Sequence, residues 1–569
     1  MVNVKNLFGM AVMATALVGC SSSDDLATDV KGNESKTEAT YAKFTIQLPT
    51  VSGTRTAGDP LFEGGTAKEY AVKDAQLVIF EKTPTSSSEG DYKFVETVKI
   101  GNLEPWNDQN SQGVTRYANI TAQLNGVSLD KTGGKYFALV ILNNDGESKV
   151  TLPTSGTYSV WNAADHAKSA AEFLKSDNGF YMANAPKYVA GDEPTTLVPI
   201  KGVYSTKAEA QNKPATTVYV ERGMAKVTIG SSTFDADKPV TTSTNYAGDK
   251  VTITNWTLDV LNKTTFPVHK TDGLNTIWNQ TWASRFFDNT STEFKRVYWG
   301  VDPNYSMTTL TDVDACKGQF YLLDRDGSTY NFDGTTGTGS SVTWADKTTP
   351  LYCLENTFDI NNMKQGQTTR VVFKATYTPA AVASETDKTF FMIGNNPKIW
   401  TMTTLKQQIT NKVQELLKST SVSVTINAGA NLLKAGSHKV TAADITITGT
   451  TASLNYDELN TKLGLDNTPG IKTYKNGECY YIARIKHFNE LTPWASGQDL
   501  YGGDNEKYLG RYGVLRNNWY DLTVSKVSAP GYPDVPEVNP TEPDDEDTKY
   551  INVEVKILDW AKRSQQVEL

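Results

Sequence analysis

The last twenty residues of the chain carry a strand that has no neighbouring segment to pair with. Four aliphatic residues alternate with polar ones at the two-residue period of a half-buried strand: Ile551, Val553, Val555 and Ile557. Residues 528–549, just before, are rich in proline and end in an acidic run, which predicts a self-repelling spacer that holds the strand away from the body. Because an isolated strand is unstable in water, residues 550–569 must pair with another sheet.

Two kinds of partner are compatible with this pattern. The strand could return to its own domain, as the last strand of many sandwiches does. It could instead add to a sheet of another subunit, where ladder hydrogen bonds provide affinity and alternate side chains fill pockets. The pattern leaves both open.

A strand of the same period opens the body of the chain. Phe44, Ile46 and Leu48 share one face of this segment, and a Gly-, Ser-, Thr- and Pro-rich loop with a single arginine, Arg55, follows it. Cleavage after Arg55 by a trypsin-like protease would free the first strand. The groove left behind could then accept the last strand, Ile551 to Ile557, of a neighbouring copy.

The N-terminal twenty residues have the features of a secretory signal. The apolar run from Leu7 to Val18 is too short for a membrane span, which takes about 20 residues. It ends in Leu17-Val18-Gly19-Cys20, which resembles the lipobox of bacterial lipoproteins, so Cys20 is the expected lipidation (palmitate) site and residues 1–20 the expected signal peptide. The acidic patch of residues 21–25 resembles the surface-export signal of Bacteroidetes lipoproteins.

Short strand-like runs with turn signals between them dominate the body. Helical periodicity is found at Trp161–Lys175 and Leu405–Leu417, and strand patterns recur at residues 75–80, 136–142, 217–220, 225–229, 251–253, 371–377, 422–426, 445–447, 480–485 and 520–524. This mixture predicts an all-β fold of antiparallel sandwiches with a few short helices. A chain of 569 residues is too long for one core, and we divide it into domains at 56–229 and 230–527, after a propeptide at 21–55.

The sequence contains no recognisable catalytic, metal or cofactor motif. Its net charge is −9 without clustered basic residues, which argues against a nucleic-acid partner. Four scattered histidines form no metal-ligand pair, and no nucleotide-binding or hydrolase motif is present. Asp324-Arg325-Asp326-Gly327 matches only half of a calcium loop and is better explained as a turn. We therefore expect a protein that is not an enzyme and has no cofactor.

Cysteines and aromatic residues leave two further questions. Cys316, Cys353 and Cys479 allow at most one disulfide, and core packing or one incidental bridge explains them. A glycan platform could be lined by four aromatic residues, Trp278, Trp282, Phe286 and Phe287. Aromatic residues are more commonly buried in the core. The alternative function is accordingly a monomeric surface glycan-binding lipoprotein.

Several motifs in order along the whole chain resemble the fimbrilins of Bacteroidetes, the major subunits of type V pili, and in particular the shaft type of the short fimbriae. They are the lipobox at Cys20, Ser52 to Asp59, Val220-Glu221-Arg222 with Ala225-Lys226, Val514 to Leu522, and the ending from Val553 to Leu569.

This resemblance implies two transthyretin-like β-sandwich domains and a lipoprotein precursor of the outer membrane. In the family an Arg-specific protease removes the anchor and the first strand, so Arg55-Thr56 is the implied cleavage bond, with Thr56 where a small residue is expected. Subunits then join by donor strand exchange into a surface fimbrium that supports adhesion. The implied partners are copies of the chain, accessory anchor and tip fimbrial proteins, the protease, and host or bacterial surface receptors.

Overall fold

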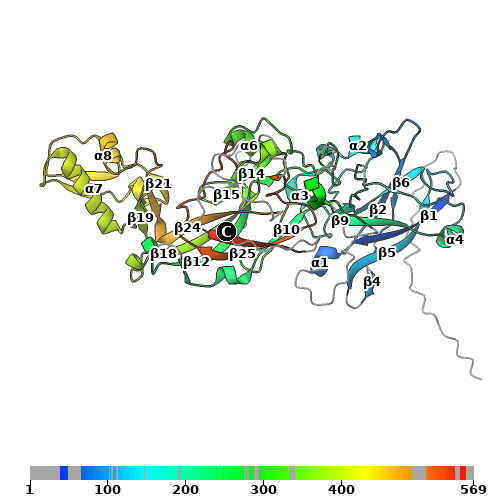
Figure 1. Cartoon of the computed structure of the whole chain (residues 1–569), viewed down its shortest axis with the longest axis horizontal. Coiled ribbons are helices and arrows are strands. Elements are labelled where there is room, and N and C mark those ends of the chain that lie inside the picture. The colour runs from blue at the N-terminus through cyan, green and yellow to red at the C-terminus, as the bar shows by residue number, and fades with distance from the viewer. Residues whose placement is uncertain are drawn as a thin grey trace, which may run out of the picture.

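The computed structural model describes residues 39–48, 66–487, 508–544 and 551–558, with short breaks at 102, 104–106, 111–112, 147, 190–192, 242–243, 275–276, 278–280, 288–293 and 332–339. The chain forms an elongated molecule with three parts in a row (Figure 1). The first sheet lies at one end, a β-sandwich lies in the middle, and a smaller unit with helices α7 and α8 lies at the other end.

The first domain is built on a nine-stranded sheet. Its order is β3-β2-β6-β7-β9-β1-β5-β4, with β8 pairing to β6. The strands are β1 (Thr40–Leu48), β2 (Ala75–Glu81), β3 (Lys93–Lys99), β4 (Asn107–Asn110), β5 (Gly113–Leu124), β6 (Tyr136–Leu142), β7 (Met182–Asn184), β8 (Val198–Pro199) and β9 (Thr216–Arg222). All pairs in this sheet are antiparallel except β1 with β9. One core cluster takes residues from β1, β2, β5, β6, β7 and β9, so β1 is part of the core.

The second domain is a sandwich of two four-stranded sheets. One has the order β17-β10-β25-β26 and the other β11-β12-β18-β24. The strands are β10 (Ala225–Ile229), β17 (Leu351–Cys353), β25 (Trp519–Val527), β26 (Ile551–Leu558), β11 (Lys238–Pro239), β12 (Lys250–Asp259), β18 (Arg370–Thr378) and β24 (Glu478–Arg484). Residues from both sheets share one core, including Val227, Val251, Phe373, Tyr481 and Leu522. A third four-stranded sheet flanks the sandwich: β13 (Leu261–Asn262), β14 (Phe320–Leu323), β15 (Thr329–Asn331) and β16 (Ser340–Ser341).

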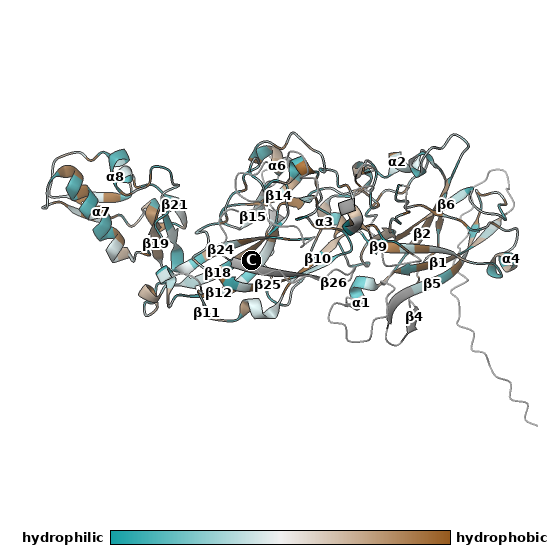
Figure 2. Ribbon diagram, viewed as in Figure 1, coloured by the Kyte–Doolittle hydropathy of each residue, from teal (hydrophilic) through white to brown (hydrophobic). Residues whose placement is uncertain are grey.

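The outer unit has a core of its own that the sequence did not predict. Helix α7 (Met402–Leu417) begins at the capping residue Thr401 and buries Leu405, Ile409 and Val413 at helical spacing. Figure 2 shows brown apolar and teal polar residues along this helix. The remaining elements of the unit are α8 (Tyr456–Lys462), β19 (Phe390–Ile393), β20 (Ser423–Ile426), β21 (Gly436–His438), β22 (Ile445–Thr448) and β23 (Ile471–Tyr474).

The all-β prediction is confirmed, and two details of the sequence analysis are wrong. The helix expected at Trp161–Lys175 is replaced by α2 (Tyr158–Trp161), a 3-10 turn and α3 (Ala170–Phe173). The break falls at Asn162, whose side chain accepts a hydrogen bond from Val268 N at 2.9 Å. The domain boundary also moves, because β10 pairs with β17 and β25 of the sandwich and not with the first sheet. The remaining helices are α1 (Ala67–Tyr70), α4 (Lys207–Gln211) and α6 (Val313–Gln319).

Candidate assembly site: strands β1 and β26 and the junction between them

Strand β1 lies inside the first sheet, between β5 and β9. It pairs antiparallel with β5 along its whole length and parallel with β9 from Phe44 to Gln47. Buried and half-buried residues alternate along it, as its sequence period predicts. Phe44 and Ile46 are completely buried and Leu48 is 8% exposed. The three side chains expected on one face are therefore together in the core.

Polar contacts fix β1 at the end away from the second domain. The Thr40 hydroxyl donates to the backbone oxygen of Val127 at 3.0 Å. Lys43 Nζ donates to the backbone oxygen of Gln211, at the end of α4, at 3.0 Å. In Figure 1, α4 marks the outer tip of the first domain. The Thr40 end of β1 thus faces the tip and the Leu48 end faces the domain junction.

The predicted lipidation and cleavage sites fall outside the described residues. Cys20 lies in residues 1–38, and Arg55 and Thr56 lie in residues 49–65. The described chain resumes at Thr66 and α1, where the first strong contact with the second domain is made.

Glu69 of α1 joins the two domains through a buried ion pair. Its Oε1 lies 2.7 Å from Lys226 Nζ of β10, and the Tyr352 hydroxyl of β17 donates to the same oxygen at 2.6 Å. Arg222 Nε, at the end of β9, donates to the backbone oxygen of Glu69 at 2.7 Å. Burial by itself raises the pKa of Glu69, but hydrogen bonds from Lys226 and Tyr352 outweigh it and hold the pKa below its ordinary value. Glu69 therefore stays ionised, and its contacts connect α1 to β9 of the first domain and to β10 of the second.

A second buried cluster lies beside this ion pair. The Glu221 carboxylate of β9 lies 2.8 Å from Arg296 Nη2 and 2.7 Å from His269 Nδ1. Burial raises the pKa of the Glu221 carboxyl, and the charges of His269 and Arg296 more than compensate, so the net shift is downward. Both partners come from the segment between β13 and α6, which makes Glu221 another contact between the domains.

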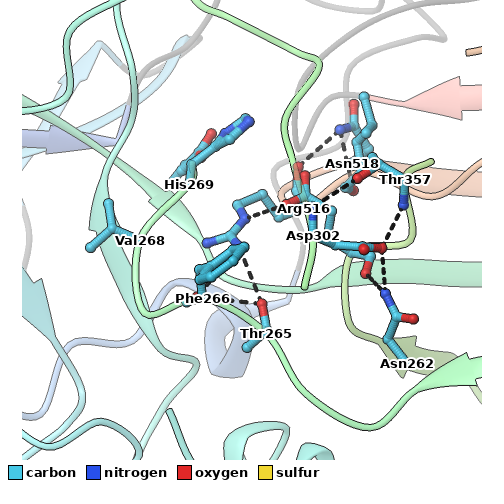
Figure 3. Close-up of polar contacts among 12 residues, drawn as sticks. Asn262, Thr265, Phe266, Val268, His269, Asp302, Thr357, Arg516 and Asn518 are labelled. Carbon is cyan, nitrogen blue, oxygen red and sulfur yellow. Dashed lines mark hydrogen bonds and ion pairs between the residues drawn. The ribbon is translucent and has the colours of Figure 1, made fainter. Parts of the chain in front are cut away.

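The cluster continues into the second domain around Asp302 and Arg516, as Figure 3 shows. The Asp302 carboxylate accepts hydrogen bonds from Asn262 Nδ2 at 2.6 Å and from Thr357 N at 2.8 Å. Arg516 contacts Glu355 at 3.2 Å and donates to the Thr265 hydroxyl at 3.2 Å. Burial raises the pKa of Asp302 to about 7 despite its hydrogen bonds.

The motifs that carried the family resemblance meet at this junction. Glu221, Arg222 and Lys226 come from one motif, and Arg516 from the other, almost 300 positions later. No structural role for these residues is predicted from the sequence. The sequence did contain one signal for this junction, which is the presence of charged residues within otherwise apolar strand segments. Because charges are seldom buried unless they are paired, such residues indicate buried ion pairs.

Strand β26 lies at the edge of the sandwich and pairs with β25. The ladder is antiparallel and runs from Ile551 opposite Val527 to Leu558 opposite Trp519, with an irregularity between Val524 and Lys526. The predicted donor residues Ile551, Val553, Val555 and Ile557 all lie in this strand, whose side chains are outside the described part of the structure. In this state the last strand occupies its own domain, the first of the two alternatives.

The expectation of a self-repelling spacer at 528–549 is wrong for its described part, residues 528–544, which is docked on the second domain. Val535 and Val538 are buried, and Tyr532 exchanges backbone hydrogen bonds of 2.8 Å with Tyr480. Asp544 is completely buried, accepts a hydrogen bond from the Thr368 hydroxyl at 3.2 Å, and lies 3.9 Å from Arg511. Apolar residues between the prolines and paired backbone groups outweigh the self-repulsion expected from composition.

Other candidate sites have structural explanations. Asp324 to Gly327 form the turn between β14 and β15, with Gly327 N donating to Asp324 O at 2.8 Å. Phe286 and Phe287 are buried in a core cluster, so neither is available for a glycan platform. Trp278, and the side chain of Trp282, lie outside the described part.

The three described cysteines are free and buried: Cys316, Cys353 and Cys479. Within the described ranges, no group of three or more His, Cys, Asp or Glu side chains is placed to hold a metal ion. Among the helices of those same ranges, none combines the length and apolar character needed to cross a membrane.

Comparison with known proteins supports the resemblance at the C-terminal end. Residues 472–566 match the family described as "Major fimbrial subunit protein type IV, Fimbrillin, C-terminal". This match covers β24, β25, the docked segment and β26. The resemblance to fimbrilins is thereby confirmed for this region. No curated protein matches the sequence.

Solved structures of low similarity cover most of the chain. A Parabacteroides distasonis ATCC 8503 protein assigned to cell adhesion is 12% identical, with 91% of this chain and 99% of that chain covered and a TM-score of 0.37. The tip fimbrial protein Mfa3 from Porphyromonas gingivalis, with a C-terminal truncation, is 12% identical, with 91% of this chain and 100% of that chain covered and a TM-score of 0.25. These scores are too low to support a conclusion about function.

Proposed function

We propose that the chain is a shaft subunit of a surface fimbria that polymerises by donor strand exchange after cleavage at Arg55. The observation that carries this proposal is the position of β1. A strand with Phe44 and Ile46 completely buried, paired on both edges, precedes the arginine-containing segment. Its removal would leave an open groove between β5 and β9.

The connection after β1 is much longer than the gap it bridges. Gln47 pairs with Tyr219 of β9, and Glu69 is bound by Arg222 of the same strand. Three residues along a strand span about 10 Å, whereas the seventeen residues 49–65 could span about 55 Å when extended. A connection of this length can reach a protease that binds around Arg55. The Glu69 contacts would keep the new N-terminal end on the subunit after β1 leaves.

Strand β26 has the properties required of the donor. It is an edge strand, so its departure from β25 leaves the rest of the sandwich sheet intact. Its eight residues nearly match the nine of β1, and its aliphatic residues have the same period. Having both a removable strand and a donor strand favours a shaft subunit over an anchor or tip, which would not need both.

The interaction energies are large enough for a filament. Burying four aliphatic side chains contributes roughly 6 to 12 kcal/mol, at about 1.5 to 3 kcal/mol each. Association costs about 4 to 15 kcal/mol, which is of similar size. Hydrogen bonds to both β5 and β9, each contributing about 0.5 to 1.5 kcal/mol, then favour the assembled state. In the uncleaved chain β1 occupies the groove at high effective concentration and prevents assembly.

The remaining parts of the proposal rest on the sequence and the fimbrilin resemblance. The precursor is a lipoprotein acylated at Cys20 and anchored in the outer membrane, and an Arg-specific protease converts it into a subunit of the cell-surface fimbrium. Accessory anchor and tip proteins complete the filament, which supports adhesion to host or bacterial surface receptors. The function is structural and requires neither catalysis nor a cofactor.

The test is assembly of purified precursor. Treatment with an Arg-specific protease should produce ladders on non-boiled gels and a new N-terminus at Thr56. The Arg55→Ala chain should stay monomeric under the same treatment, and a chain lacking residues 550–569 should be trimmed without forming ladders. Trimmed wild-type protein that remains monomeric, or ladders from the truncated chain, would contradict the proposal.

A further inference from the structure

Phe44 fills the largest site that β1 occupies in the core. Five residues of β1 face inward: Thr40, Ala42, Phe44, Ile46 and Leu48. Phe44 is the only aromatic residue among them, and it is one of the largest completely buried side chains of the described chain. It lies opposite Ile120 of β5 and Thr216 of β9, inside the core cluster of the first domain. The groove therefore contains one pocket shaped for an aromatic ring.

The aliphatic face of the donor strand has no aromatic residue to match this pocket; Tyr550 and Trp560 fall on the opposite alternation. Its alternate aliphatic positions are Ile551, Val553, Val555 and Ile557. The opposite face begins with Asn552, Glu554 and Lys556, and burying such unpaired polar and charged groups is costly. In every register that places all four aliphatic residues at inward positions of β1, an aliphatic side chain enters the pocket that held Phe44. That pocket is then underfilled, and an unfilled core site destabilises the packing around it.

We infer that the Phe44 pocket determines which strand the groove prefers, and that it favours the subunit's own first strand over the donor strand of a neighbour. This inference rests on the proposed function. The first strand has the better shape and is also part of the same chain, so both effects hold β1 in place before cleavage. After cleavage the first strand is free to dissociate and dilute, and the less well fitting donor strand can take its place. Phe44 thus keeps the precursor inactive until it is cut.

Peptide competition with the protein trimmed at Arg55 tests this inference. Peptides of residues 550–569 are added during assembly, and the concentration that halves ladder formation is measured. The set consists of the wild-type sequence and five single variants: Ile551→Phe, Val553→Phe, Val555→Phe, Ile557→Phe and Asn552→Phe. Filling the pocket should make one of the four aliphatic-face variants about tenfold more potent than the wild type, and its position identifies the register. The other three should be weaker, because a ring does not fit the smaller sites.

The Asn552→Phe peptide is the control for non-specific hydrophobicity, since its ring lies on the opposite face. Equal gains from this control and an aliphatic-face variant would overturn the inference. So would inhibition by the wild-type peptide without a gain from any of the four variants, although the proposed function would then stand. A wild-type peptide that leaves assembly unchanged at large excess would refute donor strand exchange itself.

Discussion

Replacing Ile46 by Ala should destabilise the uncleaved chain and leave the cleaved product unaffected. Ile46 is completely buried, between Ala118 of β5 and Val218 of β9, so the loss includes both transfer free energy and a cavity. Such substitutions cost about 2 to 5 kcal/mol. With a urea dependence of about 2 kcal/mol per molar, the unfolding midpoint of the first domain should fall by roughly 1 to 2.5 M. Gln47→Ala, on the half-exposed face of the same strand, is the matched control and should shift the midpoint by less than about 0.3 M.

The assay is urea unfolding of precursor and trimmed protein, with hydrogen exchange of the β5 and β9 amides to assign the transition to the first domain. Trimmed Ile46→Ala protein should match trimmed wild type, because the substituted segment is gone. A loss that persists after trimming would contradict this prediction, since β1 would then have stayed in the groove. A loss of less than about 1 kcal/mol in the precursor would contradict it as well, since β1 would not be a core strand.

Three further predictions concern the junction and the docked segment. Glu69→Gln leaves Lys226 buried beside a neutral partner and should cost about 3 to 5 kcal/mol in thermal unfolding, whereas Asp145→Asn at the exposed Lys99–Asp145 pair should cost about 1 kcal/mol or less. The pKa of Asp302 is about 7 in the folded chain against an ordinary value of 3.8, so the folded state retains a proton that the unfolded state loses between these values. Stability should therefore fall as pH rises from about 4 through 7, by at most about 1.4 kcal/mol per pH unit, and Asp302→Asn should remove this part of the slope in urea titrations. Asp544→Ala removes one of the two acceptors of the Thr368 hydroxyl and should speed hydrogen exchange at the backbone amides of Tyr532 and Val535 about tenfold; unchanged rates would show that Asp544 does not hold the segment.

The sequence predicted most strands because their signal is local. The pattern at residues 136–142 corresponds to β6 (Tyr136–Leu142) without any shift, and helix α7 was recognised from apolar residues at helical spacing. The failures come from contacts that local patterns do not contain. Asn162 interrupts the expected helix through a hydrogen bond to Val268, and β10 joins the second domain through β25, almost 300 residues later.

The candidate site was likewise predicted only where its signal is local. The sequence singled out Phe44, Ile46, Leu48 and the four aliphatic residues of the last strand, because alternation alone marks one buried face. It did not find the polar junction at Glu69, Glu221 and Asp302, because nothing in a single sequence shows which distant charges will be buried together. It also misjudged residues 528–544, because composition indicates the stiffness and charge of a segment but not the surface it meets.

Residue alternation alone shows that the chain has a strand at each end of its body, each with one apolar face that a sheet must cover. The positions of these strands, the first between β5 and β9 and the last beside β25 at a sheet edge, came from the three-dimensional fold. A strand's own side-chain period fixes which face is buried, whereas its neighbours depend on long-range backbone pairing and on the fit of the whole core.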